Sequence, residues 1–169
     1  MAEVELLLLR HGLAQPHGSA EDHLRALTSE GRLRTLRVCQ RARQLGLQAP
    51  ALISSPLVRA RQTGEIAVEA GMAPSLTCSE ALAPGGDPWP LLHDWLARTK
   101  PELPPRLILV GHEPDLGLLA CRLIDAPAGT LALKKAGIAL LAWPQDAPPS
   151  ASNPAQLRLL LTPKVLASS

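Results

Sequence analysis

The stretch LLLLRHGLA, residues Leu6–Ala14, is the part of the chain that decides the fold. Its four consecutive leucines are typical of a strand buried on both faces of a sheet, which we expect over Val4–Leu9. Arginine and histidine are rarely buried without a partner, yet Arg10 and His11 follow the leucines directly. The sequence therefore predicts a core strand that holds both side chains at its carboxyl end, where ligands bind in open α/β sheets.

The chain has 169 residues, and we expect residues 1–169 to form a single domain. It contains no Phe or Tyr and only three Trp, so aliphatic side chains must supply the core. The net charge of +2 is too small to indicate a nucleic-acid or membrane partner. The scarcity of aromatic residues also argues against a surface that stacks nucleic-acid bases.

The three cysteines, Cys39, Cys78 and Cys121, are odd in number and lack the spacing of a metal site. We interpret them as buried free thiols in a reducing cytosol. The N-terminus lacks the basic region of a signal peptide, and its apolar run is far shorter than the ~20 residues of a membrane span. These features predict a cytoplasmic protein, for which monomer and dimer both remain open.

Short apolar runs alternate with longer amphipathic ones along the chain. We expect a helix over residues 28–46 capped by Thr28, and another that runs from Pro56 to about Ala70 and is capped by Ser55. Strands alternating with helices predict an α/β sandwich with a mostly parallel central sheet. The remaining predictions are strands over 51–54, 75–78, 106–110, 136–143 and 156–162, helices over 91–99 and 115–124, and loops over 83–90 and 144–154.

Arginine and histidine follow three of the predicted strands. RHG at 10–12 follows the first, Arg59 comes one helical turn after the strand 51–54, and GHE at 111–113 follows the strand 106–110. Taken singly, the Arg-His pair is more often found in a solvated turn, Arg59 is typical of a charged helix face, and His112 could simply satisfy backbone groups. Because the carboxyl ends of parallel strands meet at one edge of the sheet, we expect two arginines and two histidines in one cationic cleft.

Such a cleft suits a phosphoryl group, because guanidinium groups offer paired donors to phosphate oxygens. The backbone N–H groups of the helix expected at Pro56 can add to this, and Gly12 and Gly111 would let the backbone approach the ligand. Nearby cations lower the pKa of a histidine, and a neutral imidazole is a competent nucleophile. We therefore predict that His11 attacks phosphorus and becomes a phosphohistidine.

Three motifs of the chain, RHG at 10–12, SPLVRARQT at 55–63 and GHE at 111–113, resemble those of the histidine phosphatase superfamily, which includes the phosphoglycerate mutases. LVGHEPDLGLLA at 109–120 and KKAGIALL at 134–141 make the chain more similar to the short bacterial phosphohistidine phosphatases of the SixA type. The resemblance spans nearly the whole chain in order.

The resemblance implies a three-layer α/β/α sandwich of the phosphoglycerate mutase type and a phosphatase that needs no metal or other cofactor. It implies that His11 is the phosphorylated nucleophile, with Arg10, Arg59 and His112 in the phosphate pocket. Where the mutases of this superfamily carry an asparagine, six places after the nucleophile, this chain has His17. We expect His17 in a mobile loop, with a phosphate contact as the alternative.

The proton donor is ambiguous. Mutase-like members of the superfamily use a glutamate at about the place of Glu80, and acid-phosphatase-like members use an aspartate where this chain has Glu113. Asp87 in the GGD stretch at 85–87 is a third candidate. We favour Glu80 over Glu113, and a surface carboxylate is the alternative for each. Ala14 stands near the place where many members have Ser or Glu, which removes one polar phosphate contact.

The ambiguous acid bears on the substrate, because an imidazole leaving group needs less protonation than an alkoxide. The segments from His11 to Thr28 and from Glu80 to Gly111 are also too short for a large lid, so the pocket suits a phosphate on a protein surface. We expect the substrate to be phosphohistidine on a protein, such as a histidine phosphotransfer domain of a phosphorelay. The alternatives are a phosphatase for a small phosphate ester and a phosphate-binding regulator without turnover.

Overall fold

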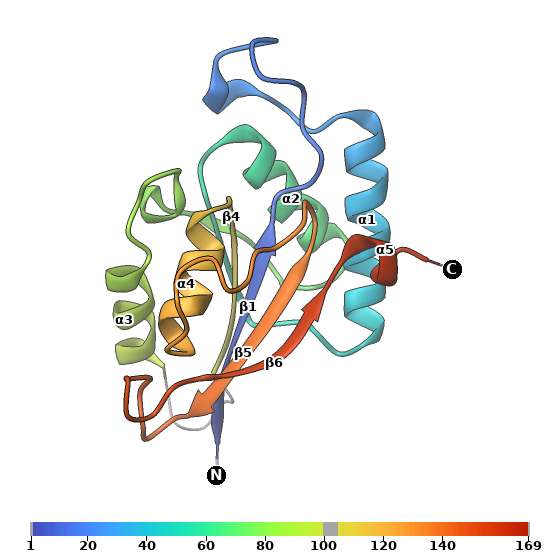
Figure 1. Cartoon of the computed structure of the whole chain (residues 1–169). Coiled ribbons are helices and arrows are strands. Elements are labelled where there is room, and N and C mark those ends of the chain that lie inside the picture. The colour runs from blue at the N-terminus through green and yellow to red at the C-terminus, as the bar shows by residue number, and fades with distance from the viewer. Residues whose placement is uncertain (1, 100–104, 169) are drawn as a thin grey trace.

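The computed structural model describes residues 2–99 and 105–168, and Figure 1 shows a central sheet with helices on both of its faces. The strands of the described part are β1 Glu3–Arg10, β2 Ala51–Ser54, β3 Thr77–Cys78, β4 Arg106–Gly111, β5 Ile138–Pro144 and β6 Gln156–Leu161. The helices are α1 Ser29–Gln44, α2 Val58–Glu69, α3 Trp89–Arg98, α4 Asp115–Leu123 and α5 Pro163–Leu166, with 3₁₀ turns η1 Asp22–Leu24 and η2 Glu80–Leu82.

The strands lie in the order β3-β2-β4-β1-β5-β6. The pairs β1/β4, β2/β4 and β2/β3 are parallel, whereas β5 runs antiparallel to β1 and β6 runs antiparallel to β5. The prediction of a mostly parallel sheet is therefore confirmed. Because β1, β2 and β4 are parallel neighbours, their carboxyl ends meet at one edge, the upper edge in Figure 1.

Strand β1 lies at the centre of the sheet and separates two hydrophobic cores. Leu7 and Leu9 pack with residues of α1, α2 and α5 on one face, and Leu6 and Leu8 pack with residues of α3 and α4 on the other. All four leucines are at most 1% exposed, as a strand buried on both faces requires. The three layers match the predicted α/β/α sandwich.

The first long helix begins as the sequence predicts. Thr28 is the N-cap of α1, and its hydroxyl oxygen accepts a hydrogen bond from the Gly31 N–H at 2.9 Å. Helix α2 differs from the prediction, because it begins at Val58 rather than at Pro56. Ser55 does not cap this helix: its hydroxyl lies 2.7 Å from Nε2 of His112 and accepts only a long bond, 3.3 Å, from the N–H of Leu57.

Three smaller predictions also need correction. Helix α3 begins at Trp89, inside the predicted loop, and the Asp87 carboxylate accepts a hydrogen bond from the Trp89 N–H at this end. Strand β3 is confined to Thr77–Cys78, and the Cys78 thiol is exposed instead of buried. Cys39 and Cys121 are buried and free, as expected.

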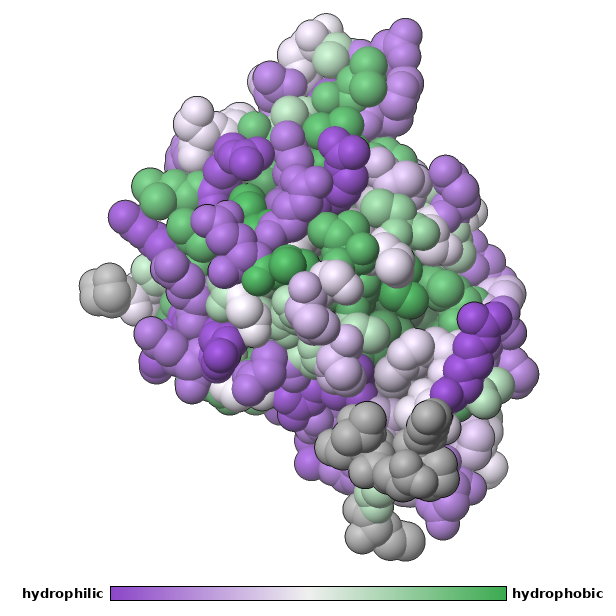
Figure 2. Space-filling view, turned by 180° about the vertical axis from the view of Figure 1, so that it is seen from behind, coloured by the Kyte–Doolittle hydropathy of each residue, from purple (hydrophilic) through white to green (hydrophobic). Residues whose placement is uncertain are grey.

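The rear surface of the described residues carries both apolar and polar side chains. Figure 2 shows hydrophobic and hydrophilic residues interspersed over this side of the molecule. Within residues 2–99 and 105–168, no helix has the length and apolar character needed to cross a membrane.

Candidate active site

The register of the sheet brings the three predicted strand ends together. Arg10 lies opposite Gly111 in the β1/β4 pair, and Ser54 lies opposite Val110 in the β2/β4 pair. Beyond the ladder, the His11 N–H donates to the Gly111 carbonyl at 3.0 Å. The segments that follow β1, β2 and β4 are thereby fixed beside one another.

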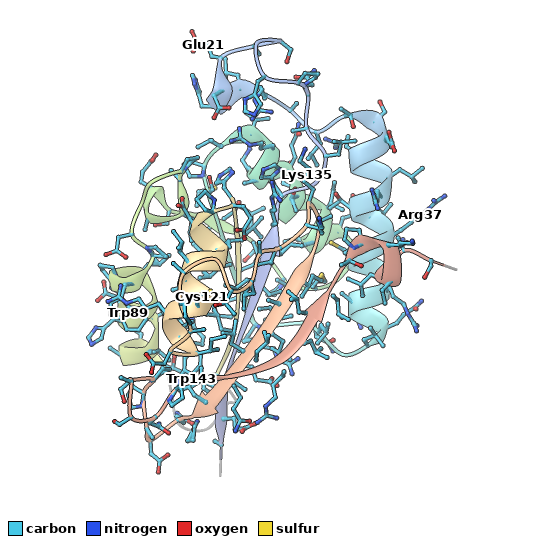
Figure 3. All side chains as sticks on the ribbon, viewed as in Figure 1. Glu21, Arg37, Trp89, Cys121, Lys135 and Trp143 are labelled. Carbon is cyan, nitrogen blue, oxygen red and sulfur yellow. The ribbon has the colours of Figure 1, made fainter. Side chains whose placement is uncertain are left out.

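A cavity of about 270 Å³ opens at this edge of the sheet. Its lining contains all four residues that the sequence assigned to the cleft. The full lining is Arg10, His11, Ala14, Gln15, Pro16, His17, Asp22, Arg25, Arg59, Pro84, His112, Glu113 and Lys135. Figure 3 shows Lys135 above the ends of the central strands, at the mouth of this region.

His11 is held as a neutral imidazole with one nitrogen available. Only 7% of the residue is exposed, and its Nδ1 lies 2.7 Å from the carbonyl oxygen of Gly12. A carbonyl can only accept a hydrogen bond, so Nδ1 carries the proton and Nε2 keeps its lone pair. Burial, followed by the charges of His112, Arg59 and Arg10, lowers the pKa of His11 to about 3. Burial therefore acts more strongly on this pKa than the cations that the sequence argument relied on.

His112 lies beside His11, with the two ring centroids 5.2 Å apart. It is 3% exposed, and burial, followed by the charge of Arg59, lowers its pKa to about 4. Its Nε2 contacts the Ser55 hydroxyl at 2.7 Å. When that hydroxyl donates to Nε2, the imidazole proton sits on Nδ1 and can be donated to a bound oxyanion.

Three of the four predicted cleft residues carry buried polar atoms that have no hydrogen-bond partner in the described part of the chain. These atoms are Nε of Arg10, Nε of Arg59 and Nδ1 of His112. Leaving a buried donor unsatisfied costs roughly 1–3 kcal/mol, and more for a charged group. A tetrahedral oxyanion in the cavity can accept from these groups, which gives a physical reason for their arrangement.

The arginines are oriented by other hydrogen bonds. Nη1 of Arg10 donates to the Leu133 carbonyl at 2.9 Å. Nη1 of Arg59 donates to the backbone carbonyl of Asp22 at 2.8 Å, and its Nη2 lies 3.2 Å from the Asp22 carboxylate. Both guanidinium groups are thus fixed before any ligand arrives.

Comparison with known proteins decides the family. Residues 6–83 match the family model of the histidine phosphatase superfamily (branch 1). The chain is also 44% identical over 137 residues to an uncharacterized protein of Picosynechococcus sp., covering 80% of this chain and 82% of that protein. The chain belongs to the histidine phosphatase superfamily.

Solved structures share the fold of this chain. The protein histidine phosphatase SixA, complexed with tungstate, superposes with a TM-score of 0.80 at 20% identity, covering 96% of this chain and 99% of SixA. A phosphoglycerate mutase from Plasmodium falciparum superposes with a TM-score of 0.67 at 15% identity, covering 94% of this chain and 91% of the mutase. The predicted fold of the phosphoglycerate mutase type is confirmed.

Gly12 does not line the active-site cavity, although the sequence suggested a phosphate contact there. Its N–H donates to the Thr63 hydroxyl at 3.1 Å. A Cβ at this position would lie 2.2 Å from Oγ1 of Thr35. Glycine is therefore required for close packing of the RHG segment against α1, and a direct phosphate contact is not supported.

The three candidate proton donors separate clearly. Glu113 lines the cavity, accepts a hydrogen bond from the Leu133 N–H at 3.3 Å, and has a pKa raised above its usual value by burial. Glu80 is exposed in η2 and does not line the cavity. Asp87 is exposed at the start of α3, where it lines a different cavity. The structure therefore favours Glu113, and the preference for Glu80 is not supported.

His17 lies at the rim of the cavity, and its side chain is 87% exposed. Its Nδ1 is 3.7 Å from the carboxylate of Asp22, an acid in the same loop. The loop position agrees with the expectation, and a phosphate contact stays a prediction. Ala14 also lines the cavity and contributes no polar side-chain atom there.

Two important residues of the cavity, Asp22 and Arg25, were not predicted from the sequence. Arg25 is 6% exposed, donates to the Asp22 carboxylate at 2.9 and 3.0 Å, and donates to the Gln15 carbonyl at 2.7 Å. These residues lie in a loop without hydrophobic periodicity, and their spacing of three is common on any surface helix. Among the described residues, no group of three His, Cys, Asp or Glu side chains is arranged to hold a metal ion.

Proposed function

We propose that this protein is a phosphatase that moves a phosphoryl group from phosphohistidine on a protein to His11, and then to water. The observation that carries the proposal is the cluster of unpartnered buried atoms on Arg10, Arg59 and His112 around a neutral His11. The arrangement offers a nucleophile and three groups for phosphate oxygens in one place.

In the first step, Nε2 of His11 attacks phosphorus and the bond from phosphorus to the leaving group breaks. The leaving nitrogen or oxygen takes the pair of electrons from that bond, and Glu113 can supply its proton. Arg10 and Arg59 balance the charge on the non-bridging oxygens, where one lost donor of this kind typically costs about 3–4 kcal/mol of transition-state stabilisation.

In the second step, a water molecule attacks phosphorus and the bond to Nε2 breaks. The Glu113 carboxylate accepts the proton of the water, which returns the residue to its acid form. The products are inorganic phosphate and the starting form of His11. In this scheme the side chains of the cavity supply every group that moves a proton or balances charge.

Two features support phosphohistidine on a protein as the substrate. An imidazole leaves as a weaker base than an alkoxide, so one partly exposed glutamate suffices as proton donor. The cavity is open at the sheet edge, and the segments around it are short, so a side chain displayed on another protein can reach His11. SixA, whose fold this chain shares, is itself named a protein histidine phosphatase.

One observation favours a second candidate, hydrolysis of a small phosphate ester. The raised pKa of Glu113 increases the fraction of this side chain that holds a proton to donate, and an alkoxide leaving group needs that proton more than an imidazole does. A small ester also fits a cavity of about 270 Å³. The two candidates share the nucleophile and differ in how strongly they depend on Glu113.

The first experiment is trapping of the phosphoenzyme with a ³²P-labelled phosphohistidine peptide. We expect label that is stable to base and labile to acid, and we expect His11→Asn to lose both label and turnover. His93→Asn is the matched control, because His93 is exposed on α3 and does not line the cavity. A wild-type protein that binds phosphate and never forms this label would instead be a phosphate-binding regulator.

The second experiment compares Glu113→Gln with the wild type on the phosphohistidine peptide and on p-nitrophenyl phosphate. If phosphohistidine is the substrate, the wild type prefers the peptide, and the variant loses no more than about tenfold on it. General acid help is worth about 10²–10⁴-fold, so a loss of that size together with a preference for esters selects the second candidate. Activity should be unchanged by EDTA, and restoration by zinc after chelation would contradict the mechanism.

A further inference from the structure

A second cavity adjoins the active site and is strongly basic. Its volume is about 460 Å³, and its charged lining residues are Arg10, Arg34, Lys134, Lys135 and Lys164. It contains no Asp or Glu, and it shares Arg10 and Lys135 with the active-site cavity. We name the surface formed by Arg34, Lys134, Lys135 and Lys164 the basic groove.

The charges of the basic groove have no acidic partner inside the described part of the protein. None of its four cations forms an ion pair there, whereas other surface cations do: Arg61 pairs with Glu65 and Arg158 pairs with Glu3. Like charges that lie close together without acidic partners repel one another, so they do not stabilise the folded protein. Their clustering beside a catalytic cavity therefore points to an anionic partner from outside the chain.

The groove is built from three separate elements. Arg34 lies on α1, Lys134 and Lys135 lie in the segment before β5, and Lys164 lies on α5. A further cavity of about 300 Å³ shares Arg34 and Lys164 and adds Arg37 and one acid, Glu30, so cations outnumber acids three to one in its lining. Figure 3 shows Arg37 on the outer side of α1. The positive surface thus extends from the mouth of the active site along α1 and α5.

The exposure of these side chains indicates the class of partner. Arg34, Lys134, Lys135 and Lys164 are all exposed, and only Arg10, at the active-site end, is partly buried. Exposed cations spread over several elements do not enclose a single small anion. They suit an extended acidic polypeptide, which meets several of them at once and is attracted over a distance of about 8–10 Å at moderate salt.

We propose that the basic groove docks an acidic segment of the protein substrate while its phosphorylated side chain enters the cavity of His11. This inference rests on the proposed function, because it assigns the groove to the same substrate. Docking beside the active site lowers KM for a phosphoprotein with acidic residues near its phosphorylated histidine. It leaves the chemical step at His11 unchanged.

The test uses the double variant Lys134→Glu/Lys164→Glu, since neither residue lines the active-site cavity. Its substrates are two phosphohistidine peptides, one flanked by Asp and Glu and one flanked by Gly and Ser. We expect kcat/KM for the acidic peptide to fall about tenfold through a higher KM. The variant removes two ion pairs with the peptide, and each exposed ion pair is worth up to about fivefold in affinity. The neutral peptide should change less than twofold, and the difference should vanish at about 1 M NaCl.

The matched control is Arg43→Glu/Arg98→Glu, which makes the same charge change at exposed positions that line neither the groove nor the cavities beside Arg37. This control variant should change kcat/KM for the acidic peptide and for the neutral peptide by the same factor. Equal losses for both peptides in the groove variant, or no loss for either, would overturn the proposal.

A binding experiment separates this inference from the proposed function. Fluorescence anisotropy with an unphosphorylated acidic peptide needs no turnover, and the groove variant should weaken its binding about tenfold at low salt. If phosphohistidine hydrolysis fails and this binding persists, the proposed function is wrong and the groove still docks an acidic polypeptide. If a single-stranded oligonucleotide binds the groove more tightly than the peptide, the partner is a nucleic acid and the inference is wrong.

Discussion

Asp22 places a carboxylate at the edge of a cavity that otherwise suits an anion. Its side chain is about half exposed and contacts the guanidinium groups of Arg25 and Arg59. The hydrogen bond from Arg25, and then the charge of Arg59, keep the pKa of Asp22 below its usual value, so the carboxylate is ionised at neutral pH. A phosphate bound in the cavity is therefore repelled by the Asp22 carboxylate, which also orients Arg25 and Arg59.

These two effects of Asp22 separate in the variant Asp22→Asn. The amide oxygen can still accept from Arg25, and the bond from Arg59 to the backbone carbonyl remains, so the orientation is kept while the repulsion is lost. Two charges 4 Å apart interact by about 1 kcal/mol in water, which predicts a two- to fivefold lower inhibition constant for vanadate. Steady-state inhibition kinetics measures this.

Glu21→Gln is the control for this measurement. Glu21 is the exposed neighbour in the same loop, and Figure 3 shows it pointing away from the body of the protein. Its substitution should change vanadate inhibition less than 1.5-fold, a bound set by salt screening of exposed charges. Weaker inhibition of Asp22→Asn would instead show that the orientation of Arg59 by the carboxylate outweighs the repulsion.

The active-site residues that could be predicted from the sequence are those that the sheet positions. Arg10, His11 and His112 follow strands, and parallel strands end at one edge, so their meeting could be predicted. Arg25 could not be found in this way, because a loop from Ala14 to Leu27 carries it there and loop paths have no period. Glu113 was undervalued because its burial depends on packing against the segment around Leu133.

The element that most closely supports the active-site segment is helix α1. Its first turn lies against Leu13: the Thr28 N–H donates to the Leu13 carbonyl at 3.0 Å. A Cβ on Gly31 would lie only 2.0 Å from that carbonyl oxygen and 2.9 Å from its carbon. Glycine at this position lets the helix touch the backbone that follows His11.

Gly31→Ala should therefore destabilise the protein although alanine is the better helix former. Propensity favours alanine by up to about 1 kcal/mol, and overpacking against backbone costs about 1–3 kcal/mol or more. We expect a net loss of about 2 kcal/mol in the free energy of unfolding, with a fall in kcat because the segment after His11 is displaced. Urea denaturation and steady-state kinetics measure the two effects.

Gly46→Ala gives a useful comparison. Gly46 has φ +79° and no atom within 4 Å of a built Cβ, so its replacement introduces backbone strain of about 1–2 kcal/mol without a collision. It should lose stability and keep kcat. Unchanged kcat in Gly31→Ala would show that α1 does not position the active-site segment.

Element boundaries could be predicted where a local signal sets them. Thr28 caps α1 through its own hydroxyl, and the sequence predicts that cap. Ser55 carries the same signal, yet a tertiary contact with His112 uses its hydroxyl, and α2 begins three residues later. The sequence analysis predicted no helix at α5, which spans only Pro163–Leu166, too short to show a helical period.

For the whole molecule, the neutral state of the two buried histidines links stability to pH. The pKa values of His11 and His112 are about 3 and about 4 in the folded protein, against 6.5 for an unperturbed histidine. Between about pH 4 and 6.5 the unfolded chain therefore binds protons that the folded chain does not. Stability then rises with pH across this window and is level above about pH 7.

The expected size of this effect follows from about 1.4 kcal/mol for each pKa unit. Lowering the pH from 7 to 5 should reduce the free energy of unfolding by about 4 kcal/mol, which is about 2 kcal/mol for each histidine. This pH range lies above the ordinary pKa of most carboxyl groups. The raised pKa of Glu113 has the opposite effect on the pH dependence of stability. It is a single group, so the effect of the two histidines is larger. Urea denaturation at several pH values measures the dependence.

His11→Gln identifies the source of this pH dependence, because it removes one of the two titrating groups and should reduce the slope by about half. His93→Gln, at an exposed position on α3, should leave the slope as in the wild type. If the stability of the wild type were the same at pH 5 and pH 7, both imidazoles would have to be protonated in the folded protein at pH 5, as they are in the unfolded chain. A neutral nucleophile at His11 would then be untenable at that pH, and the first step of the proposed mechanism would lose its basis.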